Sequence, residues 1–297
     1  MSFRRVWQAG LFELFGAIRT RRAVVVLVLY LASSLLCMNG AVTVLGKMES
    51  QLAEVLHLQT AEDGRSGVIS KTLWRSDQFQ RMVRHVVGDS LVDEDIRGKH
   101  PAELLYAWFT FLFVPLLTVL IAANRVADDI HSGAVRYMLT RVARFEWSLG
   151  KYIGTAFLLA AGLAVGALAA WCVAAFRLSG ADIPELLPSM LGWSAKAWVL
   201  SLAWLGLALG ISHVAKTGAK ATALGVSALV ALSAASTSLT LFGDRFAVLA
   251  RLFPSAVNDA LWRASFAPVV SASLWLLFLG LLYLTAGYAV FARRDAR

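Results

Sequence analysis

The stretch AVVVLVLYLASSLLCMNGAVTVL, residues 23–45, runs for 23 residues without a charged side chain. An α-helix needs about 20 apolar residues to cross the roughly 30 Å hydrocarbon core of a bilayer. The run is too long for the apolar region of a cleaved signal peptide. It therefore predicts a retained transmembrane helix.

The composition of the whole chain supports a membrane protein. Of the 297 residues, 58% are hydrophobic and only 16% are charged, outside the range of soluble globular domains. The apolar runs do not show the alternation over about ten residues that marks a barrel strand. We predict an all-α polytopic membrane protein with six transmembrane helices, at residues 23–45, 104–124, 152–176, 189–213, 221–242 and 268–292.

Lysine and arginine are distributed unevenly between the connections. Residues 1–22, 125–151, 214–220 and 293–297 hold 15 of the 28 basic residues but only five of the 19 acidic ones. Such an excess marks the cytoplasmic side of a membrane. We therefore expect both termini in the cytoplasm, an extracytoplasmic loop at 243–267, and an extracytoplasmic helical insertion at 46–103 that leans on the bundle.

Residues 1–22 show a helical pattern before the first span. An apolar stripe recurs at helical spacing, formed by Phe3, Trp7, Leu11, Leu14 and Ile18. Arg4, Arg5 and Glu13 lie mostly off that stripe. The pattern predicts an amphipathic helix lying in the cytoplasmic membrane interface; the alternative is a short solvated lead-in to the first span.

Signals for catalysis are missing from the sequence. Within the predicted spans the ionisable basic residues are Lys196, whose long stem can snorkel to the interface, and the boundary residue His213. Coupled carriers and intramembrane hydrolases place acidic residues or histidines inside their spans. The chain also has no phosphate-binding loop, and His57, His85 and His100 do not follow a zinc pattern. We expect no catalytic residue, metal site or cofactor in this chain, and no nucleic-acid partner.

A polar stretch, DDIHSGAVRYMLTRVARFEWSLGK at residues 128–151, separates the second and third spans. Apolar residues recur every four positions in it, at Ile130, Ala134, Met138 and Val142, and predict one helix over 128–144 followed by a return into the third span. Asp128 and Asp129 near its start, and Arg141 and Arg144 near its end, would suit the dipole of that helix.

This stretch resembles the signature of the type-2 permeases of ATP-binding cassette transporters. The matching residues are Asp129, Ser132, Gly133, Arg136, Leu139, Arg144, Leu149, Gly150 and Lys151. Ala134, Val142 and Ala143 depart from the family pattern. The arginine-rich amphipathic N-terminus, the element LFPSAV at 252–257 and the ending YAVFARRDAR are also similar to that family.

The resemblance implies a permease subunit of an exporter in the cytoplasmic (inner) membrane of a prokaryote. Such a subunit pairs with a second permease chain, as a homo- or heterodimer, and with two copies of a cytoplasmic subunit that binds ATP and Mg²⁺. The stretch after the second span would be the coupling segment (125–151) that docks on this ATP-binding subunit. The candidate docking residues are Asp128, Asp129, Ser132, Gly133, Arg136, Leu139, Arg141 and Arg144.

Two other classes of protein stay open. A membrane scaffold or assembly factor of an envelope complex would share the same composition and would move no substrate. A membrane-embedded enzyme is disfavoured by the missing catalytic motifs. An ATP-binding subunit that co-purifies with the chain would separate the first of these from a permease.

Overall fold

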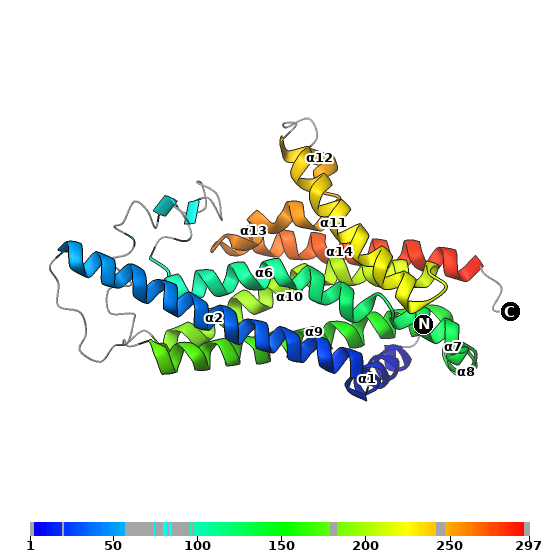
Figure 1. Ribbon diagram of the computed structural model, residues 1–297. Helices are drawn as coiled ribbons and strands as arrows, with labels where there is room; N and C mark the ends of the chain where they lie inside the picture. Colours follow the sequence, from blue (N-terminus) through cyan, green and yellow to red (C-terminus); the bar gives the residue numbers. More distant parts are fainter. Residues whose placement is uncertain are drawn as a thin grey trace.

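The computed structural model describes residues 3–19, 21–56, 98–178, 183–241 and 247–293, together with 74, 80, 81, 83, 84 and 96. These residues are almost entirely helical (Figure 1). The six long helices are α2 (Arg21–Leu56), α6 (Pro101–Ala122), α9 (Arg144–Arg177), α10 (Ile183–Val214), α11 (Gly218–Leu241) and α14 (Phe266–Arg293). The shorter ones are α1 (Phe3–Arg19), α7 (Arg125–Ser132), α8 (Ala134–Leu139), α12 (Ala247–Ala250), the 3₁₀ helix η3 (Pro254–Val257) and α13 (Asn258–Trp262).

All six predicted spans fall on helices that are long and apolar enough to cross a membrane. The prediction of an all-α polytopic membrane protein is therefore confirmed at that level. All six helices begin before the predicted start of their span, and α2, α9, α10 and α14 also end beyond it, because polar residues can continue a helix after the apolar run has stopped. Helix α2 continues to Leu56, α10 already begins at Ile183, and α9 begins at Arg144, so residues 144–151 of the predicted coupling segment are the first turns of α9.

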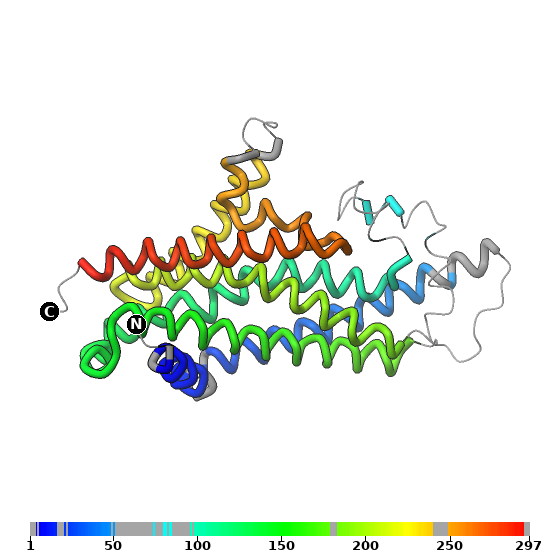
Figure 2. The backbone as a smooth tube through the Cα atoms, turned by 180° about the vertical axis from the view of Figure 1, so that it is seen from behind, coloured from blue at the N-terminus to red at the C-terminus, as the bar shows by residue number. Residues whose placement is uncertain are grey.

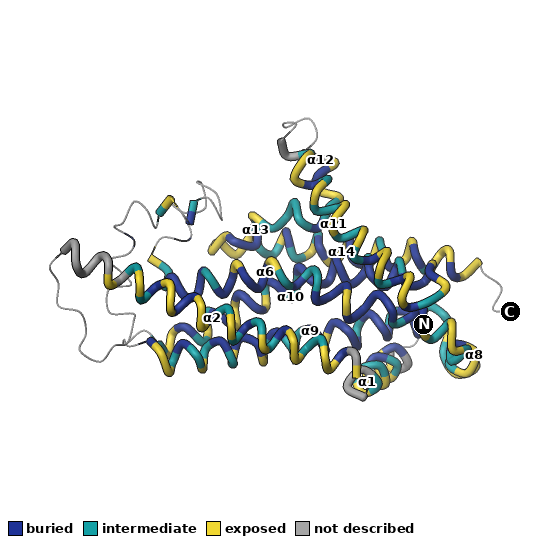
Figure 3. Tube along the Cα trace, in the orientation of Figure 1, coloured by how far each residue is buried: buried dark blue, intermediate teal, exposed yellow. Residues whose placement is uncertain are grey.

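Helix α10 is the centre of the bundle and α11 is its most peripheral span. In the most apolar window of each helix, 72% of the α10 residues are buried but only 11% of the α11 residues. α10 packs against α14, α6 and α9, and its largely buried surface contrasts with that of α11, which projects away from the other helices (Figure 3). Large apolar side chains of α11 such as Leu224 and Val230 are thus left exposed, as expected of side chains that face lipid.

Small residues allow the central helices to approach closely. A Cβ atom on Gly206 or Gly210 of α10 would overlap the backbone of α14 at Gly280 or Tyr283. In α9, a Cβ on Gly162 would lie 2.5 Å from Leu27 of α2. Small residues at these contacts therefore let the helices pack tightly.

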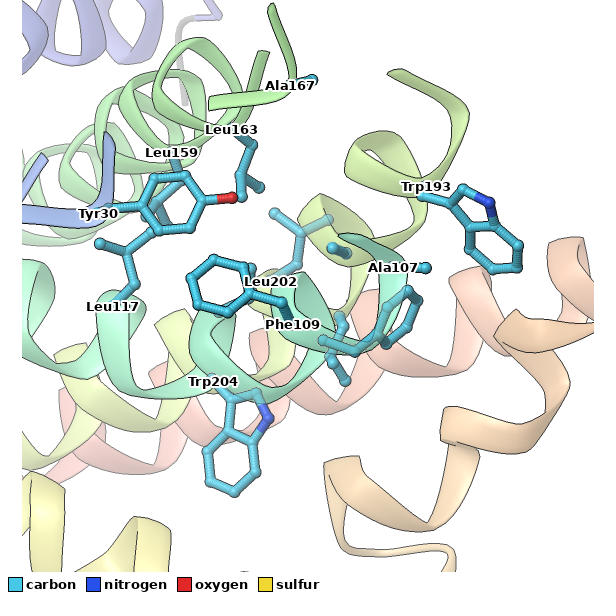
Figure 4. Packing of buried hydrophobic residues seen from close by; sticks show 14 of the residues in the cluster. Tyr30, Ala107, Phe109, Leu117, Leu159, Leu163, Ala167, Trp193, Leu202 and Trp204 are labelled. Carbon is cyan, nitrogen blue, oxygen red and sulfur yellow. The ribbon is translucent and has the colours of Figure 1, made fainter. Parts of the chain in front are cut away.

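The core between the spans is apolar and well filled (Figure 4). Phe109 of α6 stacks on Tyr30 of α2 with their ring centroids 6.4 Å apart. Leu159 and Leu163 of α9 and Trp204 of α10 are almost completely buried beside them. These residues fix the spans relative to one another, and so they also fix the short helices at the ends.

Helices α1, α7 and α8, the turn between α10 and α11, and the end of α14 all lie at one end of the bundle, on the right in Figure 1. The view from behind shows the same arrangement (Figure 2). These are the segments with the basic excess, which are predicted to face the cytoplasm. Which side of the membrane this end faces stays a prediction.

The insertion at 46–103 falls largely outside the described residues, including His57 and His85. Its first residues continue α2. Trp74, Val83 and Ile96 are buried in the main core, and the indole Nε1 of Trp74 donates to the carbonyl oxygen of Lys99 at 2.8 Å. At these positions the insertion packs against the bundle; the helical and extracytoplasmic character of the whole insertion stays a prediction. His100 caps the N-terminus of α6, because its Nδ1 accepts from the amide of Ala102 at 3.2 Å.

Candidate functional site: the α7–α8 segment and its ion cluster

The predicted single helix over 128–144 is wrong, because the segment forms two short helices. α7 ends at Ser132, and Gly133 adopts a left-handed conformation with φ 75° and ψ 2°. L-residues with a side chain rarely take that conformation. The chain therefore changes direction at Gly133 before α8, and the four-residue apolar periodicity that crosses this position does not mark one helix.

Helix α7 is anchored by a side chain from another helix. The hydroxyl of Ser212 in α10 accepts hydrogen bonds from the amides of Val126 and Ala127, at 3.1 and 2.9 Å. These amides belong to the first turn of α7, where no carbonyl of the helix itself can accept them. Val126 and Ala127 are fully buried. The start of α7 is thus fixed to the central span of the bundle.

Four charged side chains from three helices form an ion cluster beside α7, which we define as Glu13, Arg125, Asp129 and Lys151. The Glu13 carboxylate of α1 accepts from Nη1 of Arg125 at 3.0 Å and from Nζ of Lys151 at 2.8 Å. Nζ of Lys151 also lies 2.8 Å from Oδ2 of Asp129. α1, α7 and α9 are therefore joined by charge-assisted hydrogen bonds at one point.

The ion cluster is mostly shielded from solvent. The exposed fractions of the Lys151, Arg125 and Glu13 side chains are only 4%, 10% and 12%, and that of Asp129 is 30%. Burial by itself would raise the pKa of Glu13, but the charges and hydrogen bonds of Lys151 and Arg125 outweigh it and hold the pKa below its ordinary value. Glu13 therefore stays ionised at neutral pH.

Glycines allow α1 to come close enough for this contact. Helix α1 lies along the beginning of α9, where a Cβ on Gly150 would lie 2.5 Å from Cβ of Ala9. A Cβ on Gly154 would lie 2.5 Å from the carbonyl oxygen of Gly10 and 2.9 Å from Cβ of Glu13. Gly150 belongs to the leucine-glycine-lysine element of the signature stretch. That glycine therefore serves the packing of α1, and the lysine after it pairs with Glu13.

The predicted apolar stripe of α1 is exposed only in part: Leu14 is half-buried against the core, and the side chains of Phe3 and Ile18 lie outside the described residues. Trp7 and Leu11 are 42% and 38% exposed, and the neighbouring Phe12 and Phe15 are 63% and 65% exposed. The buried face of α1 instead carries Val6 and Gly10. An exposed apolar face is the surface that an interfacial helix would offer to lipid; the interfacial position itself stays a prediction.

Asp128 contacts the beginning of another span. Its Oδ2 accepts from Nδ2 of Asn124 at 3.1 Å, and its carboxylate lies directly against Gly218, the first residue of α11. A negative charge at the N-terminus of a helix is favourable because of the helix dipole. α7 is thus in contact with α11 as well as with α1, α9 and α10.

Some of the predicted docking residues are exposed, and others contact neighbouring helices. Ser132, Arg136 and Arg141 are exposed, and Tyr137 beside them is 81% exposed. Leu139 is half-buried, and Asp128, although exposed, faces Gly218. Asp129 was predicted to contact the partner, but its carboxylate is already paired with Lys151 of α9.

Arg144 is also placed differently from the prediction. It begins α9, instead of ending a helix that starts at Asp128. Its Nη1 donates to the carbonyl oxygen of Ala292 near the end of α14, at 3.4 Å. The favourable dipole interaction expected for Arg144 is therefore absent, and the side chain is used to bridge two spans.

Three residues of the site were not predicted: Glu13, Arg125 and Ser212. Glu13 is the only acidic residue among the first 22, next to five arginines, which was a signal that it has a specific partner. Arg125 directly follows the second apolar run. The capping role of Ser212 left no signal in the sequence, because it joins residues more than 80 positions apart.

One serine–histidine pair lies near the ion cluster and is sealed from solvent. The hydroxyl of Ser148 and Nε2 of His213 are 3.0 Å apart, but both residues are fully buried. Nδ1 of His213 lies 2.7 Å from the carbonyl oxygen of Leu209, where a hydrolytic triad would place a carboxylate. The pair therefore offers a substrate no access.

The sequence was compared with models of known protein families and with curated proteins, and neither comparison finds a match.

Proposed function

We propose that this chain is the permease subunit of an ATP-binding cassette transporter of the type-2 exporter class, and that α7–α8 docks on its ATP-binding subunit. The resemblance of residues 128–151 to the signature of that class supports the proposal. The observation that carries it is structural: α7 is fixed to four other helices, while Arg136 and Tyr137 of α8 and Arg141 in the turn after it are exposed at the end of the bundle.

This arrangement suits the transmission of motion. A subunit bound to α8 would push on α7 through Gly133. α7 would then pass the displacement to α10 through Ser212 and to α9 and α1 through the ion cluster. ATP and Mg²⁺ would be bound by the partner, and the two basic side chains on α8 and in the turn after it would meet acidic groups on it.

The test is co-purification of the tagged chain with the ATP-binding protein encoded next to its gene. The double substitution Arg136→Glu and Arg141→Glu should leave insertion into the membrane unchanged and reduce the amount of bound partner at least tenfold. A tenfold loss corresponds to about 1.4 kcal/mol, below the range of about 1.5–7 kcal/mol measured for close interfacial charge pairs.

The matched control reverses two arginines at positions away from α7 and α8, Arg177→Glu and Arg251→Glu. It makes the same change in net charge and should retain the partner. Wild-type retention by the Arg136→Glu/Arg141→Glu variant would contradict the docking role of these side chains. Failure of any ATP-binding protein to co-purify with the wild type would favour a membrane scaffold or assembly factor instead.

A further inference from the structure

A cavity of about 210 Å³ lies beside the ion cluster. By the same measure a cavity of about 10–15 Å³ already holds one water molecule, so this space has room for a small polar group. Its wall is formed by parts of α1, α2, α6, α7, α8 and α9 and includes Phe12, Glu13, Leu120, Arg125, Asp128, Asp129 and Lys151. It is distinct from the exposed surface of α8 proposed above to dock a partner.

One donor in this wall is buried without an acceptor. Arg125 uses Nη1 for Glu13 and Nε for the carbonyl oxygen of Ile121, at 3.0 and 3.3 Å. Its Nη2 atom is buried and has no hydrogen-bond partner. A guanidinium nitrogen left in this way costs free energy unless an oxygen occupies the neighbouring space. Arginine prefers phosphate or carboxylate oxygens at such a position.

The charge of the wall restricts which anion can bind. Three carboxylates, those of Glu13, Asp128 and Asp129, face two cations, Arg125 and Lys151, so the formal net charge of the wall is −1. A phosphate alone would add to this negative charge. A phosphate that carries its own ammonium group would add no net charge. The carboxylate oxygens also have lone pairs left to accept hydrogen bonds from that ammonium.

The rest of the wall is apolar and continues onto surface that is exposed in the chain. Phe12 and Leu120 line the cavity and are 63% and 37% exposed. They come from α1 and α6, at the end of the bundle where α1 lies across the spans (Figure 2). In a membrane protein such side chains face acyl chains. A ligand in this cavity could thus keep its polar end inside and its apolar part along Phe12 and Leu120.

We infer that the cavity binds the phosphoethanolamine headgroup of a phospholipid, with the phosphate at the guanidinium of Arg125 and the ammonium toward the carboxylates of Asp128 and Asp129. The bound lipid would fill the space between α1 and α7 and so stabilise the position of α1. This inference needs only a membrane-embedded chain, and it stands or falls independently of whether an ATP-binding subunit docks on α8.

The test is lipid binding to the purified full chain in a mild detergent, measured by native mass spectrometry. The probes are phosphatidylethanolamine, phosphatidylcholine and phosphatidylglycerol with identical acyl chains. Phosphatidylethanolamine should bind about tenfold more tightly than the other two, equivalent to about 1.4 kcal/mol. Phosphatidylcholine cannot donate hydrogen bonds from its quaternary ammonium, and phosphatidylglycerol adds negative charge. Equal binding of the three lipids would overturn the inference.

Two substitutions separate a specific site from general lipid adhesion. Arg125→Lys keeps the charge opposite Glu13 but removes Nη2, and should abolish the preference for phosphatidylethanolamine; Arg177→Lys, a control at the opposite end of α9, should not. Asp128→Asn makes the wall neutral and should raise the affinity for phosphatidylglycerol relative to phosphatidylethanolamine. An unchanged preference in both Arg125→Lys and Asp128→Asn would overturn the inference. Displacement of the lipid by equimolar glycerophosphoethanolamine would instead assign the site to a soluble ligand and also overturn it.

Discussion

Replacing Glu13 by Gln should release α1 from the bundle, because this one side chain holds both cations of the ion cluster toward α1. The substitution preserves the size of the side chain and removes its charge. Arg125 loses the carboxylate that accepts from Nη1, while Lys151 keeps Asp129 at 2.8 Å. Breaking a buried ion pair costs about 3–5 kcal/mol. Since Lys151 keeps one partner, we expect the lower end, about 3 kcal/mol.

The assay is hydrogen exchange of the full chain in nanodiscs, read by mass spectrometry. A loss of about 3 kcal/mol in the opening of α1 corresponds to a faster exchange of its amides by about 100-fold. Peptides from α10 should exchange at the wild-type rate. Glu185→Gln is the matched control, since Glu185 is an exposed residue in the first turn of α10 at the other end of the bundle. Unchanged exchange of α1 in Glu13→Gln would refute the view that the ion cluster holds this helix.

The pH dependence of the same variant has a defined sign. The pKa of Glu13 in the folded chain is below its ordinary value of 4.5. Its contribution to stability is therefore complete above pH 4.5, and is lost as the pH falls through the lowered pKa. The difference in thermal midpoint between the wild type and Glu13→Gln should be constant from neutral pH to about 4.5 and shrink below that. A difference that grows on acidification would contradict the assignment.

The remaining predictions concern packing, capping and orientation. Gly154→Leu should push α1 away from α9 and lower the thermal stability by about 1–3 kcal/mol, whereas Gly192→Ala, with open space around its Cβ, should not lower it. Ser212→Ala should cost about 1 kcal/mol and speed amide exchange in α7 more than in α10, because the amides of Val126 and Ala127 lose their acceptor; equal exchange in α7 of variant and wild type would contradict the capping role. Single cysteines at Ser132 and Ser50, both exposed and at opposite ends of the bundle, should differ in intact cells. An impermeant reagent should label the cysteine at Ser50 only, and the reverse pattern would invert the predicted topology.

Sequence patterns predicted the spans well and their ends poorly. The centres of the six helices follow from long runs without charge, since unpaired charges are costly in hydrocarbon. Outside the hydrocarbon a helix can continue with polar residues, and nothing in the apolar pattern marks its end. α9 therefore begins at Arg144, well before the predicted start of its span.

The failure to predict two helices at 125–144 has a specific cause. Apolar residues at four-residue spacing occur on both sides of Gly133, and periodicity alone cannot show that the backbone turns between them. The glycine itself was the available signal, because a glycine inside a helical pattern often marks a C-terminal cap. Its positive φ makes Gly133 the joint between α7 and α8.

The ion cluster could not be derived from local patterns, because its members belong to segments brought together only by helix packing. Glu13 and Lys151 are 138 positions apart. Their approach depends on small residues, Gly10 on α1 and Gly150 and Gly154 on α9. The sequence showed Gly150 and Lys151 only as part of the signature stretch. It did not show that Gly150 packs against α1 and that Lys151 pairs with Glu13 of the same helix.

If the proposed function holds, the contrast between α7 and α8 would let one segment both dock a partner and move the bundle. α7 is fixed by the hydroxyl of Ser212, by the ion cluster and by the contact of Asp128 with Gly218. α8 has one buried side chain, Val135, and otherwise rests on half-buried residues such as Met138. A force on α8 would therefore shift α8 locally unless the joint at Gly133 is stiffened by the bound partner. Because α7 contacts spans on several sides, a displacement that does reach it cannot stay local: it must either break the pairing of Lys151 with Asp129 or carry α9 and α1 with it.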